Sequence, residues 1–142
     1  MNKILLDAGI LGIFFSKDNT TEIDALRISI KTRQVEAHAL KPMLCEAFFH
    51  VCKVEGKDAA AAKLATFLRI YKIIQDDLDE PTINLAGTLK CQHRDRLSYI
   101  DCMNIAFCLN YRYTLHTTEK LLKQILPETR KKLRIMSYKF LV

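Results

Sequence analysis

Near its beginning the chain carries an uninterrupted apolar run, Ile4 to Leu6, which stops at the carboxylate of Asp7. A strand with one face in water alternates apolar and polar residues, whereas an unbroken apolar run is typical of a strand covered on both faces. Such strands belong to parallel sheets, because the helices that connect parallel strands cover both faces of the sheet. We therefore predict a strand of a parallel sheet over Lys3–Asp7.

Short β-prone segments alternate with helical patterns along the rest of the chain. Pro42 and Pro81 each stand in the first turn of a predicted helix, Gly56 ends another, and Thr21–Asp24 can form a capping box. The predicted helices cover residues 21–32, 42–54, 57–72, 81–93 and 98–109, with a further start at 117–119, and the predicted strands cover 35–40, 73–78, 111–117 and 134–142. This order predicts an α/β fold, a single three-layer domain over residues 1–142 with a mainly parallel central sheet flanked by helices.

The composition agrees with one folded domain. Of the 142 residues 49% are hydrophobic, which is enough to fill the core of one domain without a disulfide or a metal. A disordered or fibrous protein is therefore excluded. The five cysteines are an odd number without a C-x-x-C pair, so they indicate reduced core thiols in a cytoplasmic protein rather than a zinc site.

Segment 4–15 is the most apolar stretch near the beginning of the chain. It is interrupted by Asp7, lacks a small-residue cleavage site and is shorter than the roughly 20 residues of a membrane span, so we expect neither a signal peptide nor a membrane anchor. The formal net charge of +6 permits a polyanionic partner without requiring one.

Several acidic residues stand where a parallel sheet places its ligand site, outside the carboxyl ends of the strands. Asp7 and Glu119 follow predicted strands, and Asp101 lies in the first turn of a predicted buried helix. A carboxylate among apolar residues is costly unless it is paired, hydrogen-bonded or bound to a cation. Glu46, on the helix that Pro42 begins, can complete the cluster. Converging carboxylates without neighbouring Lys or Arg predict a site for magnesium or manganese.

The order of these motifs resembles the PIN domain family, small nucleases that include the VapC-type toxins of toxin–antitoxin pairs. Ile4–Asp7 is similar to the family's opening strand and aspartate, and Leu44–Ala47 to its helical glutamate. The most recognisable segment of the family, a serine, an aspartate three residues on and a buried helix with alanine, resembles Ser98–Ala106. Leu115–Glu119 is similar to the following strand, threonine pair and acid. The resemblance spans nearly the whole chain.

The chain departs from the family's pattern at two positions. Gly9 stands where the family commonly has Asn, Ser or Thr, and its lack of a side chain removes a hydrogen bond that could support the site. Glu119 stands where the family often has Asp, and it carries its carboxylate one methylene further from the backbone.

The resemblance implies a PIN-like metal-dependent endoribonuclease with magnesium or manganese as cofactor. Asp7 and Asp101 would be the principal metal ligands, and Glu46 and Glu119 would bind directly or through water. All four would then be catalytic, because the bound metal would activate water and neutralise charge at the scissile phosphate. The expected partners are single-stranded RNA, an antitoxin protein and a second copy of the chain in a homodimer.

Other residues are expected in secondary roles. Asn104, three residues after Asp101 on the same helix face, and Thr117 are candidates to support the site. If the site is real, the basic tail is a candidate phosphate-binding track; otherwise it is a solvated surface. The tail consists of Arg130, Lys131, Lys132 and Arg134.

Each acidic residue also has an ordinary structural interpretation. Asp101 can form a capping box with Ser98, Glu119 can be a helix-start acid, and Glu46 can pair with His50 on a solvated face. Two other functions therefore stay open. One is a catalytically weakened PIN-like module that binds RNA or protein, which Gly9 favours, and the other is a metal-dependent hydrolase of small phosphorylated substrates.

Overall fold

The computed structural model describes residues 1–16 and 20–139, without the side chains of Glu119 and Leu122. Its centre is one five-stranded sheet in the order β3-β2-β1-β4-β5. All neighbouring strands are parallel. The strands are β1 (Asn2–Leu6), β2 (Val35–Leu40), β3 (Ile74–Asp76), β4 (Thr114–Thr118) and β5 (Ile135–Tyr138). The five predicted strands and the parallel sheet are confirmed, although β3, β4 and β5 have other ends than predicted, and the last three residues of the predicted strand 134–142 lie outside the described residues.

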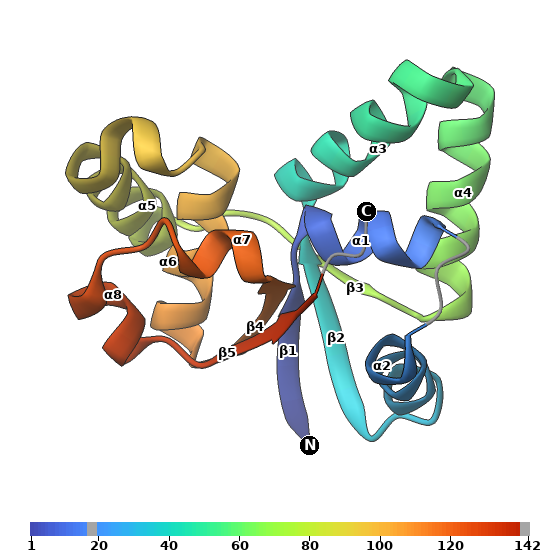
Figure 1. Ribbon diagram of the computed structural model, residues 1–142, viewed down its shortest axis with the longest axis horizontal. Coiled ribbons are helices and arrows are strands. Elements are labelled where there is room, and N and C mark those ends of the chain that lie inside the picture. Colours follow the sequence, from blue (N-terminus) through green and yellow to red (C-terminus); the bar gives the residue numbers. More distant parts are fainter. Residues whose placement is uncertain (17–19, 140–142) are drawn as a thin grey trace.

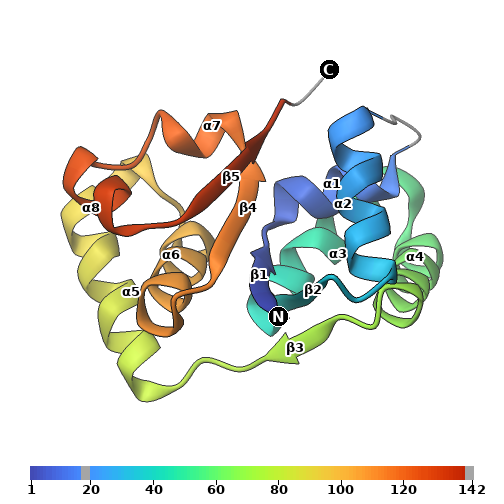
Figure 2. The same cartoon turned by 90° about the horizontal axis from the view of Figure 1, so that it is seen from below.

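Helices cover both faces of this sheet and make a three-layer α/β fold (Figure 1). Four helices, α1 to α4, lie on one face, and α5, α6 and α8 lie on the other, as Figure 2 shows from below. They are α1 (Ala8–Phe15), α2 (Thr21–Lys31), α3 (Lys41–Glu55), α4 (Lys57–Ile70), α5 (Glu80–His93), α6 (Tyr99–Tyr111), α7 (Glu119–Leu122) and α8 (Pro127–Lys132), with the 3-10 turn η1 (Arg94–Arg96) before α6. Within the described ranges, none is long and apolar enough to cross a membrane.

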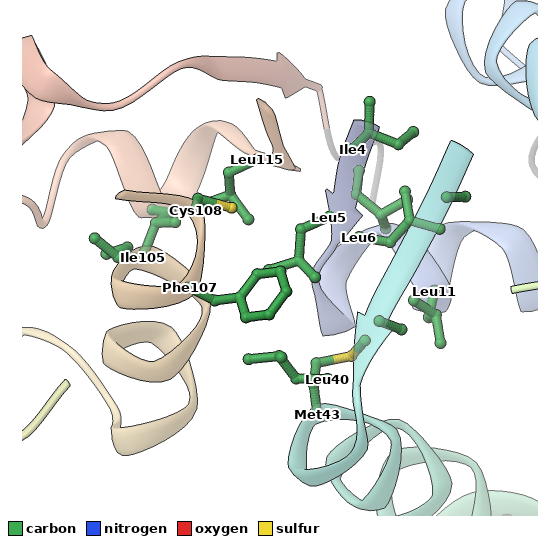
Figure 3. Close-up of a cluster of buried hydrophobic side chains, with 14 of the residues drawn as sticks. Ile4, Leu5, Leu6, Leu11, Leu40, Met43, Ile105, Phe107, Cys108 and Leu115 are labelled. Carbon is green, nitrogen blue, oxygen red and sulfur yellow. The ribbon is translucent and has the colours of Figure 1, made fainter. Parts of the chain in front are cut away.

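The central strand β1 explains why its sequence shows no alternation. Successive side chains of a strand point to opposite faces, and here both faces carry helices. In Figure 3, Leu5 points toward Phe107 of α6, while Leu6 lies on the side of Leu11 of α1. Ile4, Leu5 and Leu6 are all fully buried.

Two helices were not predicted from the sequence. In α1, apolar residues surround the helix almost completely, so no amphipathic period marks it, and its N-cap is Asp7 at the end of the first strand. The other unpredicted helix, α8, has only six residues and opens at Pro127. The capping box proposed to start at Thr21 is also wrong, because the N-cap of α2 is Thr20, whose hydroxyl accepts a hydrogen bond from Ile23 N–H (3.2 Å).

The cysteines are free thiols, but they are not all in the core. Cys102 and Cys108 are buried, and burial raises the pKa of Cys102 to about 11. Cys45 and Cys91 are exposed on α3 and α5, which corrects the expectation of core thiols. Whether a helical cysteine faces the core depends on its position around the helix. The sequence shows that position only where apolar residues repeat with a clear helical period.

Candidate active site

A pocket of about 670 Å³ opens at the carboxyl ends of β1 and β4, where a parallel sheet places its ligands. Five of the residues predicted from the sequence line it. Asp7 follows β1, Thr117 lies in β4, Glu46 comes from α3, and Asp101 and Asn104 come from α6. Segments that are distant in sequence thus bring three acids and two supporting polar side chains to one pocket.

Asp7 is held in place by hydrogen bonds to both of its carboxylate oxygens. As the N-cap of α1, it accepts the Ile10 N–H at Oδ1 (3.0 Å), and the Thr117 hydroxyl donates to Oδ2. The backbone N–H of Asp7 donates to the carbonyl of His116 (3.2 Å), so the end of β1 is tied to β4. The orientation of this carboxylate is therefore fixed by two neighbouring elements.

The electrostatic environment of Asp7 disfavours its negative charge. The residue is only 7% exposed, and its burial raises its carboxyl pKa to about 6, with a smaller contribution from the nearby Asp101 carboxylate. The hydrogen bonds from Thr117 and Ile10 oppose this shift without cancelling it. A buried carboxylate in this situation is stabilised by a cation, because a positive charge offsets both the desolvation and the repulsion from the second acid.

Asp101 has both a structural contact and a place in the pocket. It forms the predicted capping box, in which Asp101 N–H donates to Ser98 Oγ (3.1 Å) and Ser98 N–H donates to Asp101 Oδ2 (3.3 Å). Its Oδ1 accepts no hydrogen bond from the residues that the structure describes. The two sequence interpretations of Asp101 are therefore compatible, because capping uses one oxygen and leaves the other for a ligand.

Glu46 contacts His50, as the ordinary interpretation of the sequence expected, but the pair is not on a fully solvated face. Glu46 Oε1 lies 3.7 Å from His50 Nε2 across one turn of α3. Both side chains are half-exposed and line the pocket. His50 was treated from sequence only as a partner of Glu46, and its spacing of four residues from that acid was the one available sign that it faces the same pocket.

Asn104 is a buried side chain without a partner. It is 1% exposed, and neither its Nδ2 nor its Oδ1 has a hydrogen bond to the described residues. A buried amide in this state costs free energy, so an unpaired one in a native fold calls for a ligand, an ion or a water molecule. It lines the pocket less than one helical turn after Asp101.

These residues fit a divalent cation that is bound partly through water. The donors are carboxylate and amide oxygens, the ligands that magnesium and manganese prefer. Among the described side chains, no three His, Cys, Asp or Glu residues are close enough together to hold an ion. Magnesium commonly keeps several waters and uses only one or two protein carboxylates, so the separation of Asp7, Asp101 and Glu46 agrees with that mode of binding.

The two positions at which the sequence departs from the PIN family's pattern, Glu119 and Gly9, can be located in the structure. Glu119 is the first residue of α7, directly after β4, but its side chain lies outside the described part of the structure. Gly9 lies where α1 approaches β4 closely, because a Cβ on it would be 2.9 Å from Cγ2 of Thr118 and 3.3 Å from Oδ1 of Asp7. There is no space for a polar side chain at this position without a shift of Thr118, and the hydroxyl that contacts Asp7 comes from Thr117 instead.

The pocket also has basic side chains that the sequence analysis missed. They are Lys63 of α4, Arg96 of η1 and Lys120 of α7. The predicted basic tail, residues 130–134, does not line the pocket and lies on α8 and the following turn. Arg96 stands two residues before Ser98, and Lys120 directly follows Glu119, so the premise that no Lys or Arg neighbours these acids was wrong.

The parallel sheet order, the helices on both faces and the acidic pocket at the strand ends define a PIN-like α/β fold. The chain has the PIN-domain fold of the VapC proteins. VapBC2 from Rickettsia felis, bound to a DNA fragment from their promoter, is similar with a TM-score of 0.74 and 17% identity over 96% of this chain and 99% of that one. DNA-bound VapBC from Salmonella typhimurium is similar with a TM-score of 0.71 and 17% identity over 96% and 98% of the two chains.

A third similar structure is Mycobacterium tuberculosis VapC20, a toxin that cleaves the sarcin-ricin loop. Its TM-score is 0.61, with 15% identity over 79% of this chain and 86% of that one. No protein-family model matches the sequence. No curated protein sequence is significantly similar to it. The relation is therefore visible in the fold and not in overall sequence similarity.

Proposed function

We propose that this chain is a magnesium- or manganese-dependent endoribonuclease that hydrolyses RNA phosphodiester bonds in the acidic pocket. The observation that carries the proposal is the buried Asp7 carboxylate, which shares the pocket with Asp101 and Glu46 and has only neutral hydrogen-bond donors. Its N-cap role explains one hydrogen bond but not the burial of a carboxylate near a second acid, which raises the cost of its charge. The PIN-like fold provides the second support.

In this function Asp7 and Asp101 would hold the ion, and Glu46 and Glu119 would bind it directly or through water. A bound divalent ion supplies charge neutralisation at the scissile phosphate and lowers the pKa of a water molecule. Thr117 keeps the Asp7 carboxylate oriented through its hydroxyl. These assignments use the residues that the pocket brings together, with Glu119 added from its position after β4.

Two side chains of the pocket are suited to handling water. Glu46 is half-exposed and stands beside His50, so it can orient a nucleophilic water and pass a proton to the imidazole. Asn104 has a free amide N–H and a free carbonyl oxygen, so it can hold a water molecule or a phosphate oxygen in the pocket.

We further propose that the chain is the cytoplasmic toxin of a toxin–antitoxin pair, with an antitoxin protein as its partner and a homodimer as its assembly. Several similar structures are complexes of VapB and VapC proteins, which supports this partner class. The exposed tail of Arg130, Lys131, Lys132 and Arg134 stays a candidate for nucleic-acid contact outside the pocket.

The first test is cleavage of a mixed pool of single-stranded RNA by the purified protein with manganese or magnesium. We expect cleavage that EDTA abolishes and that the Asp7→Asn variant lacks. Absence of cleavage with either metal, together with retained RNA binding and no manganese binding by calorimetry, would instead identify a PIN-like binding module. Gly9, which offers the site no side-chain hydrogen bond, is the feature that favours this second function.

A further inference from the structure

Two cations on the wall of the pocket have no assigned role. Arg96 and Lys120 line it, and neither forms an ion pair with the residues that the structure describes. The third cation, Lys63, differs from them because its Nζ contacts Glu55 Oε2 at 2.7 Å. Free cations in a pocket that also contains acids indicate a ligand that presents negative charge to one part of the wall.

The segment that carries Arg96 is fixed in place. Lys90 of α5 donates through Nζ to the carbonyl oxygens of Arg94 and Leu97, both at 2.7 Å, and so spans the turn before α6. Leu97 is buried, and Arg94 has a positive φ of 45°, a conformation that persists only where the surroundings enforce it. The backbone that presents Arg96 is therefore ordered before any ligand binds, which reduces the entropy cost of binding.

An exposed aromatic ring lies at the start of α6, between two residues that line the pocket, Ser98 and Ile100. Tyr99 is the first residue of α6, directly after Ser98, which lines the pocket. It is 66% exposed, and the ammonium of Lys90 lies 4.9 Å from its ring centroid. In contrast, Tyr113 packs between His38 and Phe107. The ring of Tyr99 thus has one face held by a cation and is otherwise open to solvent.

We infer that Arg96, Lys120 and Tyr99 form a binding rim for single-stranded RNA, an inference that rests on the proposed ribonuclease function. Arg96 and Lys120 contact the phosphates that flank the scissile bond, and a neighbouring base stacks on Tyr99. This combination of cations with an exposed aromatic ring is the one that single strands use, because an unpaired base can stack on a protein ring whereas a paired base cannot. The rim positions the substrate at the pocket, and the 130–134 tail, which does not line the pocket, is the alternative surface for comparison.

The test compares the rim with the tail in RNA binding. The probe is a fluorescently labelled single-stranded RNA of ten nucleotides and mixed sequence, titrated in EDTA so that it stays intact, with its duplex as a second probe. The rim variant is Arg96→Gln with Lys120→Gln. Its control is Arg130→Gln with Lys131→Gln, which removes the same charge from an exposed surface outside the pocket.

We expect the rim variant to bind the single strand at least about tenfold more weakly than wild type. The slope of log affinity against log salt should fall by about 1.4, since each lost phosphate contact on a single strand changes it by about 0.7. Tyr99→Leu should lose about tenfold and Tyr99→Phe should keep wild-type affinity, because stacking needs the ring and not the hydroxyl. In cleavage with manganese, these losses should appear in KM while kcat changes less than twofold.

Several results would overturn this inference and leave the ribonuclease function intact. They are an equal or larger loss in the tail variant, equal losses in Tyr99→Leu and Tyr99→Phe, or duplex binding as tight as single-strand binding. If wild-type protein itself neither binds nor cleaves RNA, the proposed function fails and the rim fails with it. All altered side chains are exposed, and thermal melting of each variant checks that it is folded.

Discussion

Two groups of buried or half-buried acids lie in this sheet, and they are stabilised in opposite ways. Along β2 and β3, His38 stands between two carboxylates, with Nδ1 2.7 Å from Asp76 Oδ2 and Nε2 2.7 Å from Glu36 Oε2. At the ends of β1 and β4, Asp7 has neutral hydrogen-bond donors and a second acid, Asp101, nearby. The acids of the first group contact the His38 ring, whereas no described side chain forms an ion pair with Asp7 or Asp101.

The carboxyl pKa values reflect this difference. The hydrogen bond from His38 lowers the pKa of Glu36, while burial raises the pKa of Asp7 to about 6. The two ring nitrogens of His38 each contact one carboxylate, so this group finds its polar partners within the chain. The contrast teaches that a cluster of acids points to function when its charge is left uncompensated, and not merely when acids are close together.

The largest expected effect comes from removing the charge that the pocket leaves uncompensated. Asp7→Asn should lower RNA cleavage at least about a hundredfold, because it removes a charged ligand with little change in volume. Glu36→Gln is the matched control in the other group, and it should keep wild-type cleavage. Both are measured as single-turnover rates with manganese. Wild-type turnover by Asp7→Asn would disprove the assignment of the pocket.

The next largest effect should come from a substitution in the His38 group, and it should change stability but not cleavage. His38→Gln should lower the free energy of unfolding by about 2 kcal/mol, because it removes the ring that contacts two carboxylates. Urea unfolding at pH 7 measures this change, and cleavage by the folded variant should stay close to wild type. A large loss of cleavage without a loss of stability would show that His38 contributes to the active site after all.

The pH dependence of stability should separate the two groups further. The folded pKa of Asp7 is about 6, above its ordinary value of 3.8, so its contribution to stability is complete at low pH and is lost as the pH rises through 6. Asp7→Asn has no such loss, because the amide does not titrate. Its free energy of unfolding, relative to that of wild type, should therefore rise by roughly 2 kcal/mol as the pH increases from 4 to 7.5.

Thermal or urea unfolding of Asp7→Asn and wild type across this pH range, in EDTA, measures the difference. Manganese should reduce it at pH 7.5 by stabilising wild type, since only a charged Asp7 can bind the ion. A stability difference that stays constant from pH 4 to pH 7.5 would mean that burial of Asp7 does not disfavour its charge.

The sequence predicted those parts of this molecule that depend on local pattern. The unbroken apolar run of β1 and the helix starts at Pro42, Pro81 and Ser98 were sufficient for the α/β fold. Asp7 could be identified because an acid that ends such a run has few structural uses. The helix α1 was missed because it is apolar on nearly all sides, so its sequence lacks the periodicity that reveals a surface helix.

The features that the sequence did not predict depend on contacts between distant segments of the chain. Asp76 lies in β3, inside the predicted strand 73–78, but its contact with His38, 38 residues earlier, was not predicted. Asp79, three residues later, has a local role instead: it caps α5 by accepting the Thr82 N–H at 2.9 Å. Gly9 was recognised as unusual, yet its close approach to Thr118 follows from packing between α1 and β4 that no local pattern encodes.

The smallest expected effect concerns Asn104, the polar side chain that the pocket leaves unpaired. Replacement by leucine, which is similar in size and needs no hydrogen bonds, should raise the free energy of unfolding by about 1 kcal/mol, because it removes a buried unsatisfied amide. The same variant should cleave RNA about tenfold more slowly, since it can no longer hold a water molecule or a phosphate oxygen. Asn104 would then be retained for function at a cost in stability. Urea unfolding in EDTA and cleavage with manganese measure the two effects, and lower stability with unchanged cleavage would instead make Asn104 a structural residue with a partner of its own.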